Sequence, residues 1–591
     1  MNTNHFSSHC LSLTPALLAC LCGAPLIHAQ DVVEKWNVRY DGTTDGVHAG
    51  RAVAMDAAGN VVVTGASAGT NGFDYYTVKY HATTGAILWS DRYDGTGDGD
   101  DLVVAVAIDG EGHVIVTGSS LGPSTGTDVQ TRKYDGVTGV TLWNKRDNHS
   151  ANGDDAATAI ALDAAGNAIM TGSATVSGNG LDFFTAKYAS ANGSVLWSRR
   201  YSGSGDGDDV AADVAVDSAG DVVVTGVIQG RNSRDFYTAK YDGDTGSVLW
   251  DRTYDGPGGG EDAATAVAVD AAGNVIVTGV SQSNGNGDFY TVKYAAADGA
   301  ELWSTRQDGS GNGEDRAYDV AVDADGSVVV TGSSAGSQNL DLYIVKYAAA
   351  DGKEIWDERY NGPGNGDDAG SSVAIDPHGR VIVTGTSEGS NDSQDFYTAA
   401  YDGRTGERLW FERYDGPRDE NEVAFPFGLA LGPQGSVAIT GSTQMTRPPL
   451  AEYDMVTLLY TADLTDADAD GLPDPWEITH WGVTAGHGPG DDADLDGVAE
   501  LLEYAFGMDP GVSDPAKVPG AVMEDDFLTI TLAKTAGMTF LVETSGSLAE
   551  GSWKASTTSV LTDTAGVLKV RDIIPTTLGQ ARFLRVVVSA P

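Results

Sequence analysis

Two acidic stretches near the end of the chain have the residue types and the spacing of a metal site. Each is twelve residues long, with acids at positions one, three, five, nine and twelve and a glycine at position six. Oxygen ligands at this spacing suit Ca²⁺, with the backbone carbonyl of the seventh residue as a further ligand. The predicted ligands are Asp466, Asp468, Asp470, Leu472, Asp474 and Glu477 in one loop, and Asp492, Asp494, Asp496, Val498, Glu500 and Glu503 in the other.

Both stretches match the calcium loop of the EF-hand. The segment 463–515 resembles calcium-binding modules of secreted bacterial proteins, including dockerin-like and thrombospondin type 3-like repeats. We therefore expect two bound Ca²⁺ ions in an ion-stabilised linker whose loops are followed by short helices. An acidic linker without metal is the alternative. Cohesin binding is a lesser option, because "EYAFGMDP" lacks a recognisable dockerin recognition helix.

A second set of acids occurs in pairs at a regular interval through the first two thirds of the chain. Carboxylates gathered on one rim of a closed structure need a counter-ion, which predicts a ring that binds a cation or another ligand. The alternative is that each acid caps backbone amides in a glycine-rich loop. The pairs are Asp100 and Asp101, Asp154 and Asp155, Asp208 and Asp209, Glu261 and Asp262, Glu314 and Asp315, and Asp367 and Asp368.

The acid pairs belong to a repeat marked by tryptophan. Its copies lie 53 or 54 residues apart, at Trp36, Trp89, Trp143, Trp197, Trp250, Trp303, Trp356 and Trp410. Such a period indicates one supersecondary unit copied along the chain. In the unit 263–307, four runs read as short strands, and "DAAGN" has the Asp and Gly of a tight turn. We expect each tryptophan to pack one unit against the next.

The two ends of the repeat region complement each other. "EKWNVRYDG" around Trp36 reads as a fourth strand without the rest of its unit, whereas the last unit ends with its third strand, "DMVTLLY". Joining these ends closes a ring and removes an open sheet edge. We predict an all-β protein, with an eight-bladed β-propeller over 31–462 closed by the N-terminal strand and a small antiparallel β domain over 520–591.

The repeat resembles known propeller families. "AVAVDAAGNVIVTG" followed by "DFYTVKY" resembles the bacterial SBBP repeat, and "YDGDTGSVLW" (241–250) is similar to the tryptophan-docking motif of quinoproteins, which are eight-bladed. The second resemblance implies a redox cofactor under adjacent cysteines, with a metal-linked Asp and Glu or Asn. The three cysteines, Cys10, Cys20 and Cys22, all lie in the first thirty residues, and no unit departs enough from the repeat to mark a pocket. We therefore expect no organic cofactor.

The first residues and the overall charge bear on location and partners. Residues 1–29 resemble a secretory signal peptide, which predicts a secreted or cell-surface protein. "LLAC", ending at Cys20, is also similar to a lipoprotein processing site, the alternative. A net charge of −49 excludes nucleic acid as a partner. No later apolar run is long enough to span a bilayer.

Uniform units, acidic pairs and no mixed set of catalytic residues favour a non-enzymatic propeller. We expect a monomer that binds a protein or glycan outside the cell or acts as a cell-surface scaffold. One alternative is an extracellular enzyme, either a polysaccharide hydrolase or lyase or a divergent quinoprotein, with its site on the propeller axis. Another is a lipid-anchored assembly factor of the outer membrane, which requires an acylated Cys20.

Overall fold

The computed structural model describes most of residues 32–462 and several strands between Val522 and Ser589. Within 32–462 it leaves out 43–45, 150–151, 177–179, 206, 258, 284, 310–312, 337–338, 378, 390–392, 417–424 and 445–452. The chain divides into two compact units, one formed by Glu34–Thr461 and the other by the two ends of the chain. The predicted signal peptide and calcium loops lie outside the described residues. No helix within the described part has the length and apolar character needed to cross a lipid bilayer.

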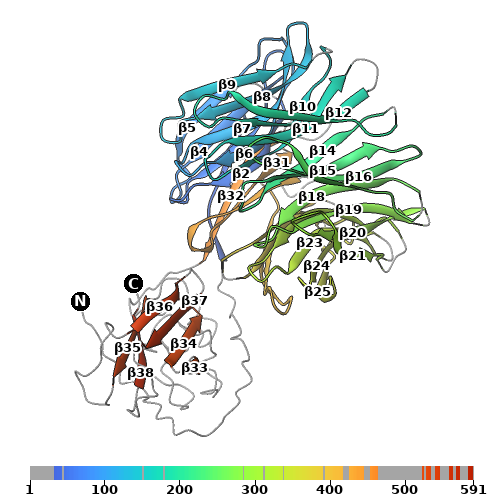
Figure 1. The fold of residues 1–591 in the computed structure, drawn as a ribbon. Coiled ribbons are helices and arrows are strands. Elements are labelled where there is room, and N and C mark those ends of the chain that lie inside the picture. The colour runs from blue at the N-terminus through green and yellow to red at the C-terminus, as the bar shows by residue number, and fades with distance from the viewer. Residues whose placement is uncertain are drawn as a thin grey trace. The chain divides into compact units, whose positions relative to one another are not determined.

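The unit Glu34–Thr461 is an eight-bladed β-propeller, which confirms the predicted fold class (Figure 1). Every blade is a four-stranded sheet. Its strands, blade by blade, are β2 (His48–Met55), β3 (Val61–Ala68), β4 (Phe73–Tyr80) and β5 (Ile87–Tyr93); β6 (Asp101–Ile108), β7 (Val114–Gly122), β8 (Gly126–Tyr134) and β9 (Thr141–Asp147); β10 (Ala156–Leu162), β11 (Ala168–Val176), β12 (Gly180–Tyr188) and β13 (Val195–Tyr201); β14 (Val210–Val216), β15 (Val222–Gln229), β16 (Arg234–Tyr241) and β17 (Val248–Tyr254); β18 (Asp262–Val269), β19 (Val275–Ser283), β20 (Asn286–Tyr294) and β21 (Glu301–Gln307); β22 (Arg316–Val322), β23 (Val328–Ala335), β24 (Leu340–Tyr347) and β25 (Glu354–Tyr360); β26 (Ala369–Ile375), β27 (Val381–Glu388), β28 (Gln394–Tyr401) and β29 (Arg408–Tyr414); and β30 (Phe425–Leu431), a 3₁₀ turn (Pro433–Gly435), β31 (Val437–Gln444), β32 (Tyr453–Ala462) and β1 (Val32–Tyr40).

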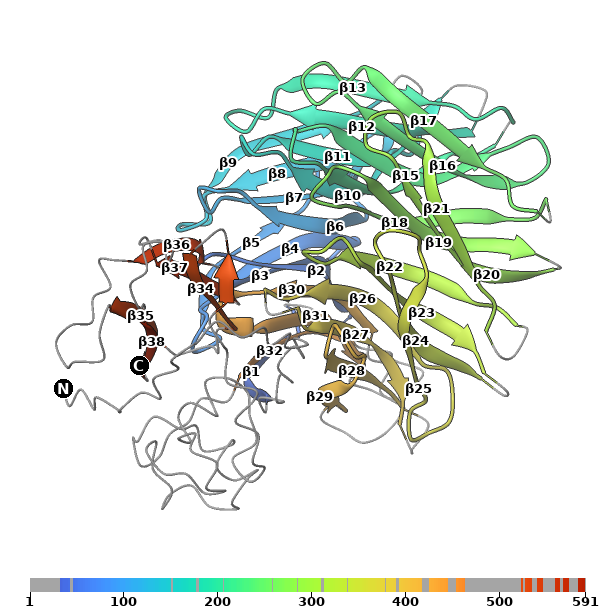
Figure 2. The ribbon, with the colours of Figure 1, turned by 60° about the horizontal axis from the view of Figure 1, so that its bottom comes forward.

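The N-terminal strand closes the ring, as the two incomplete ends of the repeat predict. The last blade has the strand order β1-β32-β31-β30, so the first and last strands of the propeller are neighbours in one sheet. Figure 2 shows these two strands together, although they come from opposite ends of the repeat region. The first strands of successive blades contact one another around the ring, including β2 with β30. The sheet of the last blade therefore has strands from both ends of the propeller.

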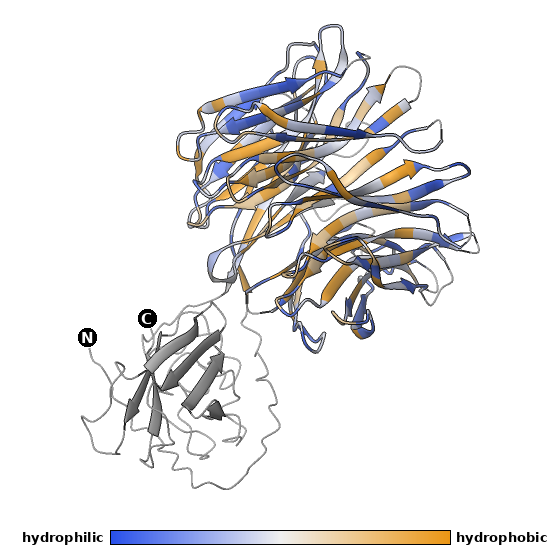
Figure 3. Ribbon diagram, in the orientation of Figure 1, coloured by the Kyte–Doolittle hydropathy of each residue, from blue (hydrophilic) through white to orange (hydrophobic). Residues whose placement is uncertain are grey.

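The burial of each strand follows its sequence. Second strands such as β19 (Val275–Ser283) are apolar and buried on both faces, whereas the fourth strand β21 (Glu301–Gln307) buries only its tryptophan. Figure 3 shows apolar residues along the strands and hydrophilic residues in the connecting loops. In the "DAAGN" turn, Asp270 accepts hydrogen bonds from the backbone N–H groups of Ala272 and Asn274, both at 2.9 Å. Gly273 there has a φ of +80°, which glycine adopts at low cost.

Each tryptophan packs against the next blade, as expected. The indole of Trp250 contacts Gly299, in the turn before the fourth strand of the following blade, and its Nε1 donates to the carbonyl of Ala296 at 3.2 Å. Lys240 Nζ donates to the same carbonyl at 3.3 Å and forms a buried ion pair with Asp217 at 2.7 Å. Equivalent residues repeat this arrangement at five other interfaces between blades, with Trp89, Trp143, Trp197, Trp303 and Trp356.

The C-terminal unit contains antiparallel β structure, which agrees with the predicted fold class. Its strands form a four-stranded sheet and a two-stranded sheet. They are β33 (Val522–Glu524), β34 (Phe527–Ala533), β35 (Thr539–Ser545), β36 (Thr558–Asp563), β37 (Val567–Asp572) and β38 (Phe583–Ser589).

Replacing Lys240 with methionine tests the contact between blades. Lys240→Met leaves the Asp217 carboxylate buried without its cation, so we expect the free energy of unfolding to fall by about 3–5 kcal/mol. The matched control is Lys353→Met, since Lys353 forms an exposed ion pair with Asp351 and should have no measurable effect. Urea denaturation followed by tryptophan fluorescence measures both variants. Equal midpoints for the two variants would contradict the assigned role.

Candidate functional site

The acid pairs lie where one blade leads into the next, and the second acid of each pair is buried. Asp209 accepts hydrogen bonds from the backbone N–H of Gly203 at 2.6 Å and of Gln229 at 2.6 Å. It thereby joins the loop before its blade to the start of the hairpin between the second and third strands. The same pair of backbone hydrogen bonds is made by Asp101, Asp155, Asp262, Asp315 and Asp368.

The first acid of a pair reaches back to the preceding blade. Asp208 accepts a hydrogen bond from the backbone N–H of Leu181 at 3.0 Å, in the hairpin between the second and third strands of that blade. Corresponding bonds join Asp100 to Phe73, Asp154 to Thr127, Glu314 to Gly287 and Asp367 to Leu340. These contacts place two sets of loops on one rim: those that join successive blades and carry the acid pairs, and the hairpins between the second and third strands. They also match the alternative in which each acid caps backbone amides of a glycine-rich loop. A cation at this rim stays a prediction.

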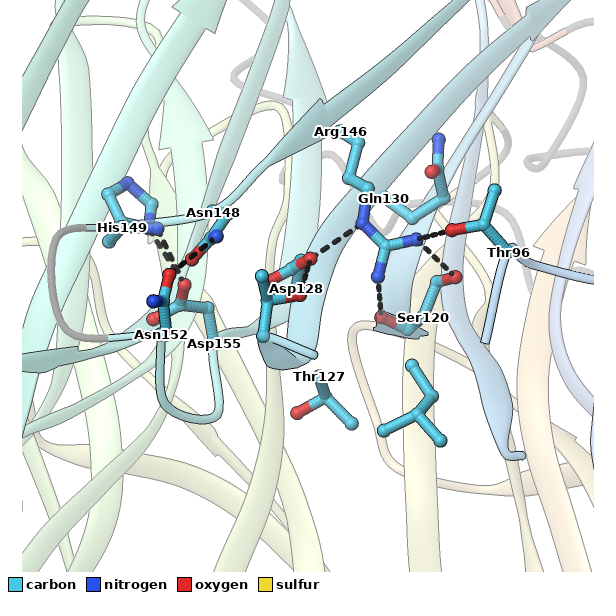
Figure 4. Close-up of polar contacts among 12 residues, drawn as sticks. Thr96, Ser120, Thr127, Asp128, Gln130, Arg146, Asn148, His149, Asn152 and Asp155 are labelled. Carbon is cyan, nitrogen blue, oxygen red and sulfur yellow. Dashed lines mark hydrogen bonds and ion pairs between the residues drawn. The ribbon is translucent and has the colours of Figure 1, made fainter. Parts of the chain in front are cut away.

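The close-up in Figure 4 shows one such corner, between the second and third blades. The backbone N–H of His149 donates to Asp155 at 2.9 Å, and the ring Nδ1 of His149 lies 3.3 Å from the same carboxylate oxygen. Burial acts to raise the pKa of Asp155, but the hydrogen bonds from His149 and Thr175 outweigh it and lower the pKa. Nearby, Arg146 pairs with Asp128 at 2.6 Å and donates to the Ser120 hydroxyl at 3.2 Å. Hydrogen bonds and an ion pair therefore hold the loop between these two blades in place.

Three corners bring three carboxylates together in a geometry that a metal ion could use. Each combines an acid from the third strand, an acid that follows the fourth strand, and the buried second acid of a pair. In each group, one ligand atom per residue lies within 4.8 Å of the others. Within the described part of the chain, these groups are Asp74, Asp94 and Asp101; Asp235, Asp255 and Asp262; and Asp288, Asp308 and Asp315.

The first blade has no acid pair. His48 occupies the position of the buried acid, and its Nδ1 lies 2.9 Å from the hydroxyl of Ser67. This histidine is fully buried, so its ring lies inside the loop and does not face solvent. In the last blade the corresponding residues, Val423 and Ala424, lie outside the described residues.

Sequence reasoning missed two acids on the innermost strands. Asp213 accepts a hydrogen bond from the backbone N–H of Val267 in the next blade at 2.9 Å, and Asp319 does the same with Val373 at 2.8 Å. Burial raises the pKa of Asp213 to about 7 and that of Asp319 to about 6. The sequence contains a signal for them, because the aligned position in other units holds Ala52, Ala105, Ala159, Ala266, Ser372 or Gly428.

The raised pKa of Asp213 predicts a measurable pH dependence. Between pH 4 and 7 the folded state holds a proton that the unfolded state has released, so this group lowers stability as the pH rises through that window. Asp213→Asn keeps an acceptor for the Val267 N–H and removes the titration. We compare the free energy of unfolding of the variant with that of the native protein. We expect this difference to favour the variant by about 2–3 kcal/mol more at pH 8 than at pH 5.

Urea denaturation curves at both pH values measure this difference. The exposed Asp208→Asn is the control, because it should not change the pH dependence between the two values. Parallel pH dependences for Asp213→Asn and the native protein would contradict the assignment.

The residues present do not fit the redox cofactor that the quinoprotein resemblance implies. That resemblance requires adjacent cysteines over the cofactor ring, and all the cysteines of the chain precede the described residues. Both carboxylate oxygens of Asp213 and of Asp319 already accept backbone hydrogen bonds. The described part of the propeller therefore lacks the donor set of such a site.

Solved structures with a similar fold have diverse roles. BamB from Moraxella catarrhalis is 12% identical, with 73% of this chain and 100% of that chain covered and a TM-score of 0.41. Sqt1 from Chaetomium thermophilum, bound to the N-terminus of ribosomal protein L10, is 12% identical over 72% of this chain and 98% of that one, with a TM-score of 0.46. The quinohemoprotein alcohol dehydrogenase ADHIIG from Pseudomonas putida HK5 is 12% identical over 73% and 76%, with a TM-score of 0.43. At this level of similarity the roles of these proteins do not transfer to this chain.

Sequence comparison identifies the family. No curated protein matches the chain. A family model described as outer membrane protein assembly factor BamB matches residues 30–287 and 234–442. These two overlapping matches include all but the end of the propeller and amount to more than half of the chain. The chain therefore belongs to the BamB-like family of β-propellers.

Proposed function

We propose that this protein is a non-enzymatic propeller that works outside the cell, where it binds a protein or glycan partner or acts as a surface scaffold. One observation carries the proposal: the acids repeated from blade to blade bind backbone N–H groups of the loops that join the blades. Residues used in this way stabilise the rim. A rim of stable loops on a rigid ring is a surface suited to binding.

The proposed location rests on residues 1–29, whose pattern is that of a secretory signal peptide. The strongly acidic composition agrees with a protein that stays soluble in the presence of salt and divalent cations. The two acidic loops add a calcium-stabilised linker between the propeller and the C-terminal β unit.

The family favours a second role, that of an assembly factor anchored at the outer membrane. The matched family is described as an outer membrane protein assembly factor, and the anchor comes from the lipoprotein-like site at Cys20. For this chain the role requires that Cys20 be lipidated and kept in the mature protein. Fractionation of cells that express the native protein and Cys20→Ser separates the two proposals. Membrane association that is lost in Cys20→Ser would favour the assembly factor over the secreted propeller.

Calcium titration calorimetry tests the linker. We expect the mature protein to bind two Ca²⁺ ions, and the double variant Glu477→Gln/Glu503→Gln to lose both, because each substitution removes the bidentate ligand of its loop. Asp208→Asn and Asp367→Asn are the rim controls and should leave the two sites unchanged. Calcium binding that survives in the double variant but is lost in the rim variants would assign the calcium sites to the propeller rim.

Substrate turnover tests the absence of catalysis. We expect the mature protein to leave polysaccharide, peptide and alcohol substrates unchanged over a day, as measured by product chromatography. Turnover that is lost in Asp213→Asn would overturn the proposal and place an enzymatic site at the innermost strands, the position predicted for an enzyme of this architecture.

A further inference from the structure

Neighbouring blades are joined by a second contact, between stacked tyrosines. The residue four positions after the repeat tryptophan lies flat against a tyrosine on the third strand of the next blade. The ring centroids are 3.9 Å apart for Tyr40 and Tyr76, 4.0 Å for Tyr201 and Tyr237, 4.1 Å for Tyr254 and Tyr290, and 4.0 Å for Tyr360 and Tyr397. Each stacked pair fills the space between two blades near the rim.

Between the fifth and sixth blades this tyrosine is missing. Gln307 occupies its position, and a pocket of about 370 Å³ lies beside Tyr343, the ring on which the tyrosine would stack. Phe289 meets Tyr343 edge-on at 5.5 Å. The other lining residues include Asp308, Ser334, Asp357 and Arg359. The pocket thus has an aromatic wall and several polar groups, the composition of a small-ligand site. It also departs from the expectation that no unit marks a pocket.

Two other interfaces that lack the tyrosine pair hold a flat group from the chain itself in this region. Between the first and second blades, Arg132 lies over the ring of Tyr93 at 4.3 Å and pairs with Asp91 at 3.1 Å. Between the second and third blades, His149 lies 4.2 Å from Phe184. A planar ring or a guanidinium group is therefore the kind of group that this position accepts.

The charge around the pocket favours a cation. Between the sixth and seventh blades, Arg408 lies over Tyr360 and donates to the hydroxyl of Tyr397 at 3.2 Å. The position that corresponds to Arg408 in the sixth blade is Glu354, which accepts a hydrogen bond from Gln307 at 2.8 Å. At this position the sixth blade therefore has a negative side chain where the seventh blade has a positive one.

Apart from Arg359, the charged side chains that line the pocket are the carboxylates of Asp308 and Asp357. Arg359 is the cation of the pocket, and it is already held by Asp341 at 3.2 Å and by the hydroxyl of Ser334 at 2.8 Å. Asp308 belongs to the carboxylate group with Asp288 and Asp315. Partial desolvation and the charges of those two neighbours raise the pKa of Asp308. A bound cation would relieve this repulsion.

We propose that the pocket between the fifth and sixth blades binds a guanidinium group, presented by an arginine side chain of a partner polypeptide. A guanidinium is planar and stacks on an aromatic face, where a compact ammonium group gains less. Its five N–H donors match the carboxylates of Asp308 and Asp357, which line the pocket, and of Glu354, which contacts the lining residue Gln307. This inference goes beyond the proposed function, because it names the chemistry of a partner and holds for a secreted propeller and for an assembly factor alike.

The test uses the full mature chain and two blocked tripeptides, Ala-Arg-Ala and Ala-Lys-Ala, followed by NMR titration. We expect millimolar binding of the arginine peptide, and binding of the lysine peptide that is about tenfold weaker. Gln307→Tyr restores the repeat residue and fills the pocket. It should weaken binding of the arginine peptide at least about tenfold while the Tm stays equal or rises.

Two further variants keep the test informative should Gln307→Tyr fold poorly. Glu354→Gln should weaken binding of the arginine peptide about threefold or more. Its control is Glu301→Gln, the corresponding exposed glutamate one blade earlier, where Tyr254 and Tyr290 are stacked, and it should have no effect.

Three results would overturn the proposal. The first is absence of binding at tens of millimolar peptide. The second is equal binding of both peptides by the native protein and Gln307→Tyr, which would indicate general attraction to an acidic surface. The third is displacement of the arginine peptide by Ca²⁺ that disappears in Asp288→Asn, which would assign these carboxylates to a metal ion.

Discussion

A single carbonyl oxygen in most blades accepts two hydrogen bonds from the blade before it. One comes from the indole of the repeat tryptophan and the other from a buried lysine, as at Gly243, where Trp197 and Lys187 donate at 3.0 and 2.7 Å. The carbonyl lies in the turn before the fourth strand, against which the indole packs. Because a buried ammonium group needs an acid nearby, each lysine also pairs with an aspartate of its own blade, here Asp163. The ring depends on this contact, since it links blades that are otherwise separate sheets.

At the rim, the buried carboxylates of the acid pairs bind backbone N–H groups and not lysine side chains. Buried aspartates such as Asp209 hold the loops between blades through backbone N–H groups, so many of the acids of this chain have a local structural partner. The tyrosine pairs add packing between blades at the level of the rim. Together these contacts explain how short strands and glycine-rich loops form a rigid ring without disulfides in the propeller.

Function is expected where the repeat is broken. Uniform blades present the same surface many times, whereas a departure creates one distinct place. Asp213 and Asp319 change the innermost strands at two blades, and Gln307 removes a ring between the fifth and sixth blades. The first change introduces groups that titrate near neutral pH. The second opens a pocket with an aromatic wall and negative charge.

The sequence by itself determined the repeat architecture. A tryptophan every 53 or 54 residues, turns with Asp and Gly, and complementary ends predict the number of blades and the closure by the N-terminal strand, because these signals are local and occur many times. The partners of single side chains were decided only by the tertiary structure. The repeat left a cation ring and a set of backbone caps as alternatives, and only the folded chain shows which N–H groups of distant loops reach Asp209. Likewise, Gln307 reads as an ordinary polar residue until folding places it opposite Tyr343, 36 residues away in the next blade.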